Sequence, residues 1–382
     1  MDFPNFSFAT ATEIRFGRGQ AAAALPEVAT LAERLLLVTG SQPARAGWAR
    51  DGLVAQGRQV TVFSAPGEPD IAMIAAGVVA ARQAGAQAVL AIGGGAAIDA
   101  GKAIAALVPA HRPVLDHLEV VGKGLPLDVP PLPFVAMPGT AGTGAEVTRN
   151  AVIAVPEARR KVSLRDRAML PRLAVIDPGL TESCPRAVTL ASGLDAITQV
   201  IEPYLCTRAN PMTDALCRSA IPAGLSALAR LMEKEDPQAR DAMAWVSLCG
   251  GLALANAGLG VVHGLAGPLG GLSGAAHGAI CGALLPHGLA LNNRRASAHE
   301  ALARFAEIRG WIAAALGGTP RDAYERLADW ARAQGLPGLD AQGVDAGVRL
   351  QAAADAGASS SMRANPAELS VTDLEALLDA AR

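Results

Sequence analysis

The sequence predicts an α/β domain with a parallel sheet, followed by an all-helical domain, at residues 1–180 and 181–382. In the first part, short apolar runs typical of buried strands alternate with helical segments, a pattern that predicts parallel strands joined by crossover helices. After Pro178 the strand patterns end, and Ala- and Leu-rich helical segments follow. A chain of 382 residues is also too long for one ordinary hydrophobic core, which favours two domains.

The first domain repeats a strand followed by a helix. Residues 8–17 alternate well enough for an opening strand or hairpin. Further strands are expected at residues 34–39, 59–64, 87–92, 133–137 and 173–176, and helices at 44–56, 71–84 and 96–107. This order of elements is typical of a nucleotide-binding α/β domain.

The second domain is expected to contain helices only. They are predicted at residues 187–205, 211–232, 238–258, 279–291, 297–316, 320–335 and 371–381. Five glycines and Pro268 lie between His263 and His277, so we expect the chain to turn there. A continuous helix would hold the two histidines roughly 21 Å apart, at about 1.5 Å per residue, whereas a turn can bring them together.

Composition restricts the class of protein. Hydrophobic residues make up 51% of the chain and charged residues 18%, with a net charge of −2, so we expect a folded globular protein that binds no nucleic acid. The N-terminus has no apolar run, and no later apolar stretch is long enough to cross a bilayer without glycine, proline or charge. We therefore expect a cytoplasmic protein with no membrane partner.

Five widely spaced cysteines lie between residues 184 and 281, without any C-x-x-C pair. This spacing favours free thiols in a reducing compartment over disulfides or a zinc ribbon. We interpret them as small buried apolar residues. They are Cys184, Cys206, Cys217, Cys249 and Cys281.

A first glycine loop, Gly93-Gly94-Gly95, lies directly between a predicted strand and a predicted helix. Bare backbone amides at a helix N-terminus form an anion site suited to a pyrophosphate. The loop matches neither standard glycine motif, because Ile98 stands at the last position of G-x-G-x-x-G and Lys102 lacks the glycine spacing of a P-loop. The alternative is a tight turn that binds no ligand.

A second glycine loop runs from Pro138 to Thr148 and also follows a strand. Its glycines, together with Thr140 and Thr143, add amide and hydroxyl donors at the carboxyl edge of the sheet, where open α/β sheets bind ligands. Two such loops at one edge favour a nucleotide more strongly than either loop alone.

Candidate metal ligands lie in an otherwise apolar stretch of the second domain. Asp195 and Gln199 are four residues apart, so both side chains leave one face of a helix. His263, His277 and His287 follow. An aspartate with two histidines is a common ligand set for zinc or iron. The alternative is that these histidines are satisfied core or capping residues.

The two loops and these ligands together resemble the iron-containing, or group III, alcohol dehydrogenase family, over nearly the whole chain. The family's GGGS-x-x-D-x-x-K loop corresponds to Gly93 to Lys102, and its P-x-T-x-G-T-G-x-E-x-T loop to Pro138 to Thr148. The resemblance implies a dehydroquinate synthase-like fold and an enzyme that interconverts an alcohol and an aldehyde or ketone by hydride transfer. It also implies NAD or NADP, and one divalent metal, zinc or iron, in a cleft between the domains.

The resemblance also assigns individual residues. The dinucleotide would contact Gly40, Gly94, Gly95, Ala96, Asp99, Thr140, Thr143 and Lys161. Asp195, His263 and His277 would bind the metal and serve as the catalytic residues, with Gln199 as a weak fourth metal ligand.

Three residues depart from the family pattern. Gln199 stands where the iron enzymes have a histidine ligand, which leaves the fourth ligand and the choice of iron open. Gly267 stands where many members have a second histidine, in an H-x-x-x-H pattern. Gly40 stands where members that prefer NAD often have an aspartate, which favours tolerance of NADPH.

Two other functions share this pattern. One is a lyase like dehydroquinate synthase, which uses NAD within its cycle and a Glu, His, His metal set; the other is a metal-free protein that senses a nucleotide. Asp195 and the second glycine loop fit the dehydrogenases better. The sequence does not select one alcohol or aldehyde. A homodimer is expected.

Overall fold

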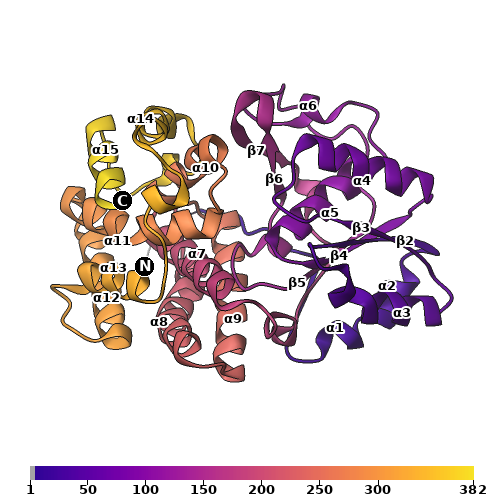
Figure 1. Ribbon diagram of the computed structural model, residues 1–382, viewed down its shortest axis with the longest axis horizontal. Coiled ribbons are helices and arrows are strands. Elements are labelled where there is room, and N and C mark those ends of the chain that lie inside the picture. The colour runs from indigo at the N-terminus through magenta and orange to yellow at the C-terminus, as the bar shows by residue number, and fades with distance from the viewer. Residues whose placement is uncertain (1–4) are drawn as a thin grey trace. The chain divides into compact units, whose positions relative to one another are not determined.

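The computed structural model describes residues 5–382, which form two compact units (Figure 1). The first unit contains residues 10–140 and 144–183, and the second contains residues 184–382. Two short segments, residues 5–9 and 141–143, also belong to the second unit. The sequence pattern gave no sign that part of the second glycine loop packs with the helical unit.

The first unit is built on a six-stranded sheet in the order β1-β8-β5-β4-β2-β3, with every neighbouring pair parallel. The strands are β1 (Glu13–Phe16), β2 (Arg34–Thr39), β3 (Gln59–Ser64), β4 (Ala88–Gly93), β5 (Phe134–Pro138) and β8 (Leu173–Ile176). The helices are α1 (Gln20–Ala23), α2 (Leu25–Thr30), α3 (Gly47–Ala55), α4 (Ile71–Gln83), α5 (Gly95–Leu107) and α6 (Val114–His117). The predicted parallel sheet with crossover helices is confirmed.

Helices cover both faces of this sheet, with α1 to α3 on one side and α4 and α5 on the other (Figure 1). Strand β2 shows why, because successive side chains point to opposite faces. Leu35 and Leu37 pack with α1, α2 and α3, whereas Leu36 and Val38 pack with α4 and α5. All four side chains are buried, as expected for a central strand of a parallel sheet.

The opening segment is a strand, one of the two expected alternatives, and it pairs with β8 over Glu13–Phe16. The sequence analysis missed a hairpin formed by β6 (Asn150–Val155) and β7 (Arg160–Arg165), which pair antiparallel. The sequence did contain its signal, since Ala151, Ile153 and Val155 alternate with less buried residues.

The second unit is helical. Its helices are α7 (Arg186–Leu205), α8 (Pro211–Glu233), α9 (Pro237–Asn256), α10 (Val261–Ser273), α11 (His277–Arg295), α12 (His299–Leu316), α13 (Ala323–Ala333), α14 (Ala346–Asp355) and α15 (Val371–Ala380). The expected turn between His263 and His277 is present, but it is short, because α10 runs through four of the five glycines and Pro268 before the turn. Packing outweighs low helix propensity here, since Leu265 and Leu269 are fully buried. The turn falls at residues 274–276, where Gly274 has a φ of 74°.

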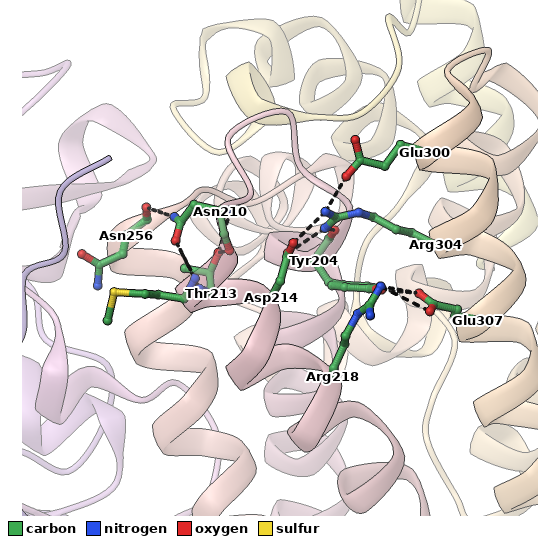
Figure 2. Close-up of polar contacts among 10 residues, drawn as sticks. Tyr204, Asn210, Thr213, Asp214, Arg218, Asn256, Glu300, Arg304 and Glu307 are labelled. Atoms are coloured by element: carbon green, nitrogen blue, oxygen red, sulfur yellow. Dashed lines mark hydrogen bonds and ion pairs between the residues drawn. The ribbon is translucent and has the colours of Figure 1, made fainter. Parts of the chain in front are cut away.

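A polar network ties α7, α8 and α12 together (Figure 2). The Arg304 guanidinium donates two parallel hydrogen bonds of 2.7 Å to the Asp214 carboxylate and lies 4.7 Å from the centre of the Tyr204 ring. The Tyr204 hydroxyl donates to Glu307 and accepts from Arg218. We call these five residues the Tyr204 network. Each charged member lies against a group of opposite charge, which is typical of a structural network.

The remaining features concern thiols and membrane spans. Residues 5–382 contain five free cysteines, of which Cys184 is half-buried and the others are buried. No single helix within those residues has the length and apolarity to cross a membrane, although α9 and α10 together pass that test with a bend of 96° between them.

Candidate dinucleotide and metal sites

The glycine loops meet at the carboxyl edge of the sheet. Strand β2 connects outward to β3, whereas β4 connects in the other direction to β5, so the strand order reverses between β2 and β4. Ligands of open α/β sheets bind at such a switch point. Gly40 follows β2 and Gly93 ends β4, and a Cβ at Gly93 would lie 3.2 Å from the Gly40 nitrogen. The Gly139 amide donates to the Gly93 carbonyl at 2.7 Å, which brings the second loop to the same place.

Helix α5 begins at this edge, with Gly94 as its N-cap residue and Gly95 as its first residue. The first amides of a helix have no partner within the helix, and its dipole favours negative charge at this end. Ala96 lies in the same first turn, and the Thr140 side chain lies 3.4 Å from where a Gly94 Cβ would be. The arrangement fits a pyrophosphate.

Asp99 and Lys102, further along α5, anchor the surrounding loops. The Asp99 carboxylate accepts from the Val152 amide at 3.1 Å, and burial raises its pKa to about 6. The Lys102 ammonium donates to the carbonyls of Ala145 and Asn150 and to the Thr148 hydroxyl. Because all three of its donors are used inside the protein, Lys102 is a structural residue.

Two other predicted cofactor residues already have partners within their own units. The Lys161 ammonium on β7 forms an ion pair with Glu68. The Thr143 carbonyl accepts a hydrogen bond of 2.6 Å from the Gln199 amide. These contacts give both residues a structural role within the protein. Their contact with a dinucleotide stays a prediction.

In the helical unit, four potential metal-ligand atoms lie within 4.8 Å of one another, on Asp195, His263, His277 and Cys281. The Asp195 Oδ1 atom is 3.4 Å from His263 Nε2 and 3.7 Å from His277 Nε2. Asp195 comes from α7, His263 from α10, and the other two from α11. We call these four residues the Asp195 cluster.

A close approach of two helices brings His277 to Asp195. His277 is the first residue of α11, and a Cβ at the next residue, Gly278, would lie 2.7 Å from the Ala191 carbonyl oxygen of α7. Only glycine allows this contact without moving a helix. The turn at residues 274–276 then places His263 beside His277, with ring centres 5.5 Å apart.

Glu202 orients the His263 ring through the ring nitrogen that faces away from the cluster, Nδ1. Its carboxylate lies 2.7 Å from His263 Nδ1 and accepts from the Val262 amide at 2.7 Å. Burial alone would lower the pKa of His263, but the carboxylates of Asp195 and Glu202 raise it to about 10. With Nδ1 donating to Glu202, the Nε2 atom faces Asp195. A carboxylate behind a histidine in this way is the usual support of a metal ligand.

Two buried atoms of the cluster are left without a hydrogen bond from any part of the chain that the structure describes. They are Asp195 Oδ1 and His263 Nε2. Asp195 is 2% exposed and His263 is 6% exposed, so neither atom is hydrated from bulk water. Burial would raise the pKa of Asp195, but His277, His263 and Cys281 lower it, so the carboxylate is held ionised. These donor atoms fit a divalent cation.

Two further candidates came from the sequence, and the role of Gln199 as a metal ligand stays a prediction. Gln199 is buried one turn after Asp195, with its amide nitrogen on Thr143. His287 lies on α11 outside the Asp195 cluster, and burial and Arg332 lower its pKa.

Sequence reasoning missed Glu202 and Cys281, although both had a signal. Glu202 lies seven residues after Asp195 and Cys281 four after His277, so each shares a helix face with a predicted ligand.

Models of two adjoining family domains match this chain. The iron-containing alcohol dehydrogenase model matches residues 11–178, and the C-terminal model of the Fe-containing alcohol dehydrogenase family matches residues 189–382. The chain belongs to the iron-containing alcohol dehydrogenase family. The dehydroquinate synthase-like lyase and the nucleotide sensor are therefore not favoured.

Individual relatives agree with this family. The chain is 33% identical to a 4-hydroxybutyrate dehydrogenase of Cupriavidus necator, over 91% of each chain. It is 34% identical to the lactaldehyde reductase of Escherichia coli K12, over 72% of this chain and 73% of that protein. The crystal structure of a 1,3-propanediol oxidoreductase superposes with a TM-score of 0.88 at 27% identity, covering 99% of this chain and all of that one. The chain is an NAD-linked alcohol and aldehyde oxidoreductase.

Proposed function

We propose that this chain is a metal-dependent NAD(P)-linked dehydrogenase that holds one divalent cation, zinc or iron, at Asp195, His263 and His277. The observation that supports the cation most strongly is the pair of buried atoms without hydrogen bonds, Asp195 Oδ1 and His263 Nε2. A buried polar atom without a partner costs about 1–3 kcal/mol, so such a pair is retained where a ligand supplies the missing contact.

The chain's own residues prepare the site. Asp195 supplies negative charge, Glu202 fixes the ring of His263 so that Nε2 faces the cluster, and the apolar surroundings exclude water. When bound there, a divalent cation supplies Lewis-acid stabilisation of negative charge on the substrate oxygen. The alcohol carbon gives a hydride to the oxidised nicotinamide, and the hydroxyl proton leaves to solvent.

The dinucleotide is proposed to bind in the first unit, at Gly94, Gly95, Ala96 and Thr140. The free amides at the start of α5 hold the pyrophosphate. Gly40, at the end of β2, has no carboxylate to repel a 2′-phosphate, so we propose that NADPH is accepted as well as NADH. Asp99 and Lys161, in the same unit, are proposed to contact the dinucleotide as well.

The substrate is proposed to be a small aliphatic alcohol or the matching aldehyde, bound in the helical unit, in a homodimeric cytoplasmic enzyme. The relatives named for 4-hydroxybutyrate and lactaldehyde support a short carbon chain. Only 3% of the residues are aromatic, which favours a site with aliphatic walls.

Metal analysis combined with NADH and NADPH oxidation over aldehydes of graded length and charge tests the proposal. We expect about one divalent ion per chain and activity that a chelator removes and the metal restores. His263→Ala should lose metal and activity, whereas the matched control His299→Ala, at an exposed histidine, should keep both. Full activity in a metal-free protein would contradict the proposal.

A further inference from the structure

Cys281 completes the Asp195 cluster. It lies one turn after His277 on α11, is fully buried, and its sulfur is 3.6 Å from His277 Nε2. The sulfur also lies within 4.8 Å of the ligand atom of Asp195. The other three buried cysteines, Cys206, Cys217 and Cys249, lie outside the cluster.

The separations in the cluster fit ligands of one tetrahedral ion. Metal–ligand bonds of about 2.0–2.3 Å at tetrahedral angles place ligand atoms about 3.3–3.6 Å apart. The three measured separations are 3.4 Å for Asp195 and His263, 3.7 Å for Asp195 and His277, and 3.6 Å for His277 and Cys281. The sulfur therefore stands at ligand distance, as the nitrogen and oxygen atoms do.

The Gln199 side chain is engaged in another contact. Its amide nitrogen donates to the Thr143 carbonyl at 2.6 Å, which fixes the side chain against residues 141–143. A neutral amide oxygen is also a weaker ligand than a thiolate. The donor that the family's histidine would supply at residue 199 is therefore replaced from another helix.

We propose that Cys281 is the fourth protein ligand of the metal, giving an Asp, His, His, Cys set in which a thiolate replaces the missing histidine. The proposal rests on the metal site proposed above. It rests also on the buried Asp195 Oδ1 and His263 Nε2 atoms, which face the same point without hydrogen bonds. On binding, the Cys281 thiol loses its proton to solvent and the sulfur coordinates the ion.

The thiolate changes which metal fits. Soft sulfur ligands select zinc over manganese or magnesium, and an aspartate with two histidines and one thiolate suits zinc better than ferrous iron. A zinc ion held by these four residues would need a fifth ligand position to bind a substrate oxygen. With Cys281 as a ligand, we expect zinc in place of iron in this chain.

X-ray absorption at the zinc edge of the purified full-length protein tests the proposal without any variant. We expect one sulfur neighbour near 2.3 Å. The cobalt-substituted protein should show an intense sulfur-to-cobalt charge-transfer band in the near ultraviolet. Cys281→Ser should lose that band and bind zinc at least about 10-fold more weakly, the loss typical of even an outer-shell partner.

Cys217→Ser is the matched control, because Cys217 is equally buried but lies in the core of α8. It should keep the charge-transfer band and the zinc affinity. Bound metal with only nitrogen and oxygen neighbours would overturn the role of Cys281 and leave the Asp195, His263 and His277 site standing. A protein that takes up neither zinc nor cobalt would overturn both proposals.

Discussion

Helix α7 contributes to two polar clusters, the partly exposed Tyr204 network and the Asp195 cluster. In the Tyr204 network, Arg304 pairs with Asp214, and Tyr204 lies between Arg218 and Glu307 (Figure 2). In the Asp195 cluster, an aspartate oxygen and a histidine nitrogen remain without a hydrogen bond within residues 5–382. Every member of the first cluster has a protein partner. In the second, Asp195 Oδ1 and His263 Nε2 face each other at 3.4 Å without a hydrogen bond, and we propose that a cation completes it. Unpaired buried atoms also occur outside the proposed sites, at His117 and Tyr324 for example, so the signal of a site is their gathering with further metal-ligand atoms.

The largest expected effect is the loss of activity when Asp195 is removed from the Asp195 cluster. Asp195→Ala removes the anionic ligand, so kcat/KM should fall by roughly 10²–10³ or more, since a catalytic metal supplies several kcal/mol of charge stabilisation. Steady-state NADH oxidation together with circular dichroism measures this. An Asp195→Ala protein with near wild-type kcat/KM would show that the unpaired atoms have no catalytic role.

Arg304→Ala should have the opposite profile. It leaves Asp214 unpaired in a site where it is only 21% exposed, so the free energy of unfolding should fall by about 3 kcal/mol. Activity per folded molecule and metal content should stay unchanged. Urea denaturation measures the loss, with Arg332→Ala, at an exposed pair, as the control. Loss of metal from folded Arg304→Ala would mean that the two clusters are coupled.

The start of α5 is the proposed anion-binding part of the dinucleotide site, through its first backbone amides. Gly94→Val fills their approach path, while the nearest atoms to its Cβ are at 3.4 Å, so the fold should tolerate it. We expect NADH to bind roughly 100-fold more weakly, with little change in melting temperature. Fluorescence titration decides this, with Gly310→Ala, where a Cβ meets no atom within 4 Å, as the control for a glycine replacement. Unchanged NADH affinity would contradict the pyrophosphate site.

Glu146 has one buried carboxylate oxygen without a hydrogen bond but belongs to neither cluster. It lies near Lys102, whose ammonium donates all of its hydrogen bonds to other groups. Burial raises the pKa of Glu146 to about 7 from 4.5. Its stabilising contribution is therefore complete below pH 4.5 and lost as the pH rises through 7. Glu146→Gln should raise the free energy of unfolding at pH 8 by about 2 kcal/mol and leave it almost unchanged at pH 4. Urea midpoints at both pH values measure this, with exposed Glu157→Gln as the control. An equal effect at both pH values would rule out the titration.

The smallest expected effect concerns cofactor choice. A Cβ at Gly40 meets no atom within 4 Å, so Gly40→Asp should fold normally. Its carboxylate should repel a 2′-phosphate and shift the kcat/KM ratio about 10-fold toward NADH. Gly47→Asp, at another open glycine, is the control. A ratio equal to that of the wild type would mean that residue 40 lies outside the ribose site.

The sequence predicted the parts of this molecule that depend on local pattern. The parallel sheet, its glycine loops and the long helices follow from periodicity and from glycine at strand ends. Local pattern did not predict that α10 continues to Ser273. Tertiary packing of Leu265 and Leu269 keeps this segment helical although it contains glycine and proline.

Long-range contacts explain what sequence reasoning missed at the site. Asp195, His263 and His277 were predicted from residue type and spacing, whereas the roles of Glu202 and Cys281 depend on how close α7 comes to α10 and α11. A Cβ at Gly278 would meet the backbone of α7, and no local pattern reports that contact. Cys281 therefore looked like a small apolar residue from the sequence alone.

Metal content per chain is the most direct test of whether the Asp195 cluster binds a cation and the Tyr204 network does not. Elemental analysis of the purified protein, of Asp195→Ala and His263→Ala, and of Arg304→Ala compares the two clusters in one measurement. The account predicts about one divalent ion per chain in the wild type and in Arg304→Ala, and almost none in the other two. A fully active, metal-free wild type, or equal metal in all four proteins, would contradict it.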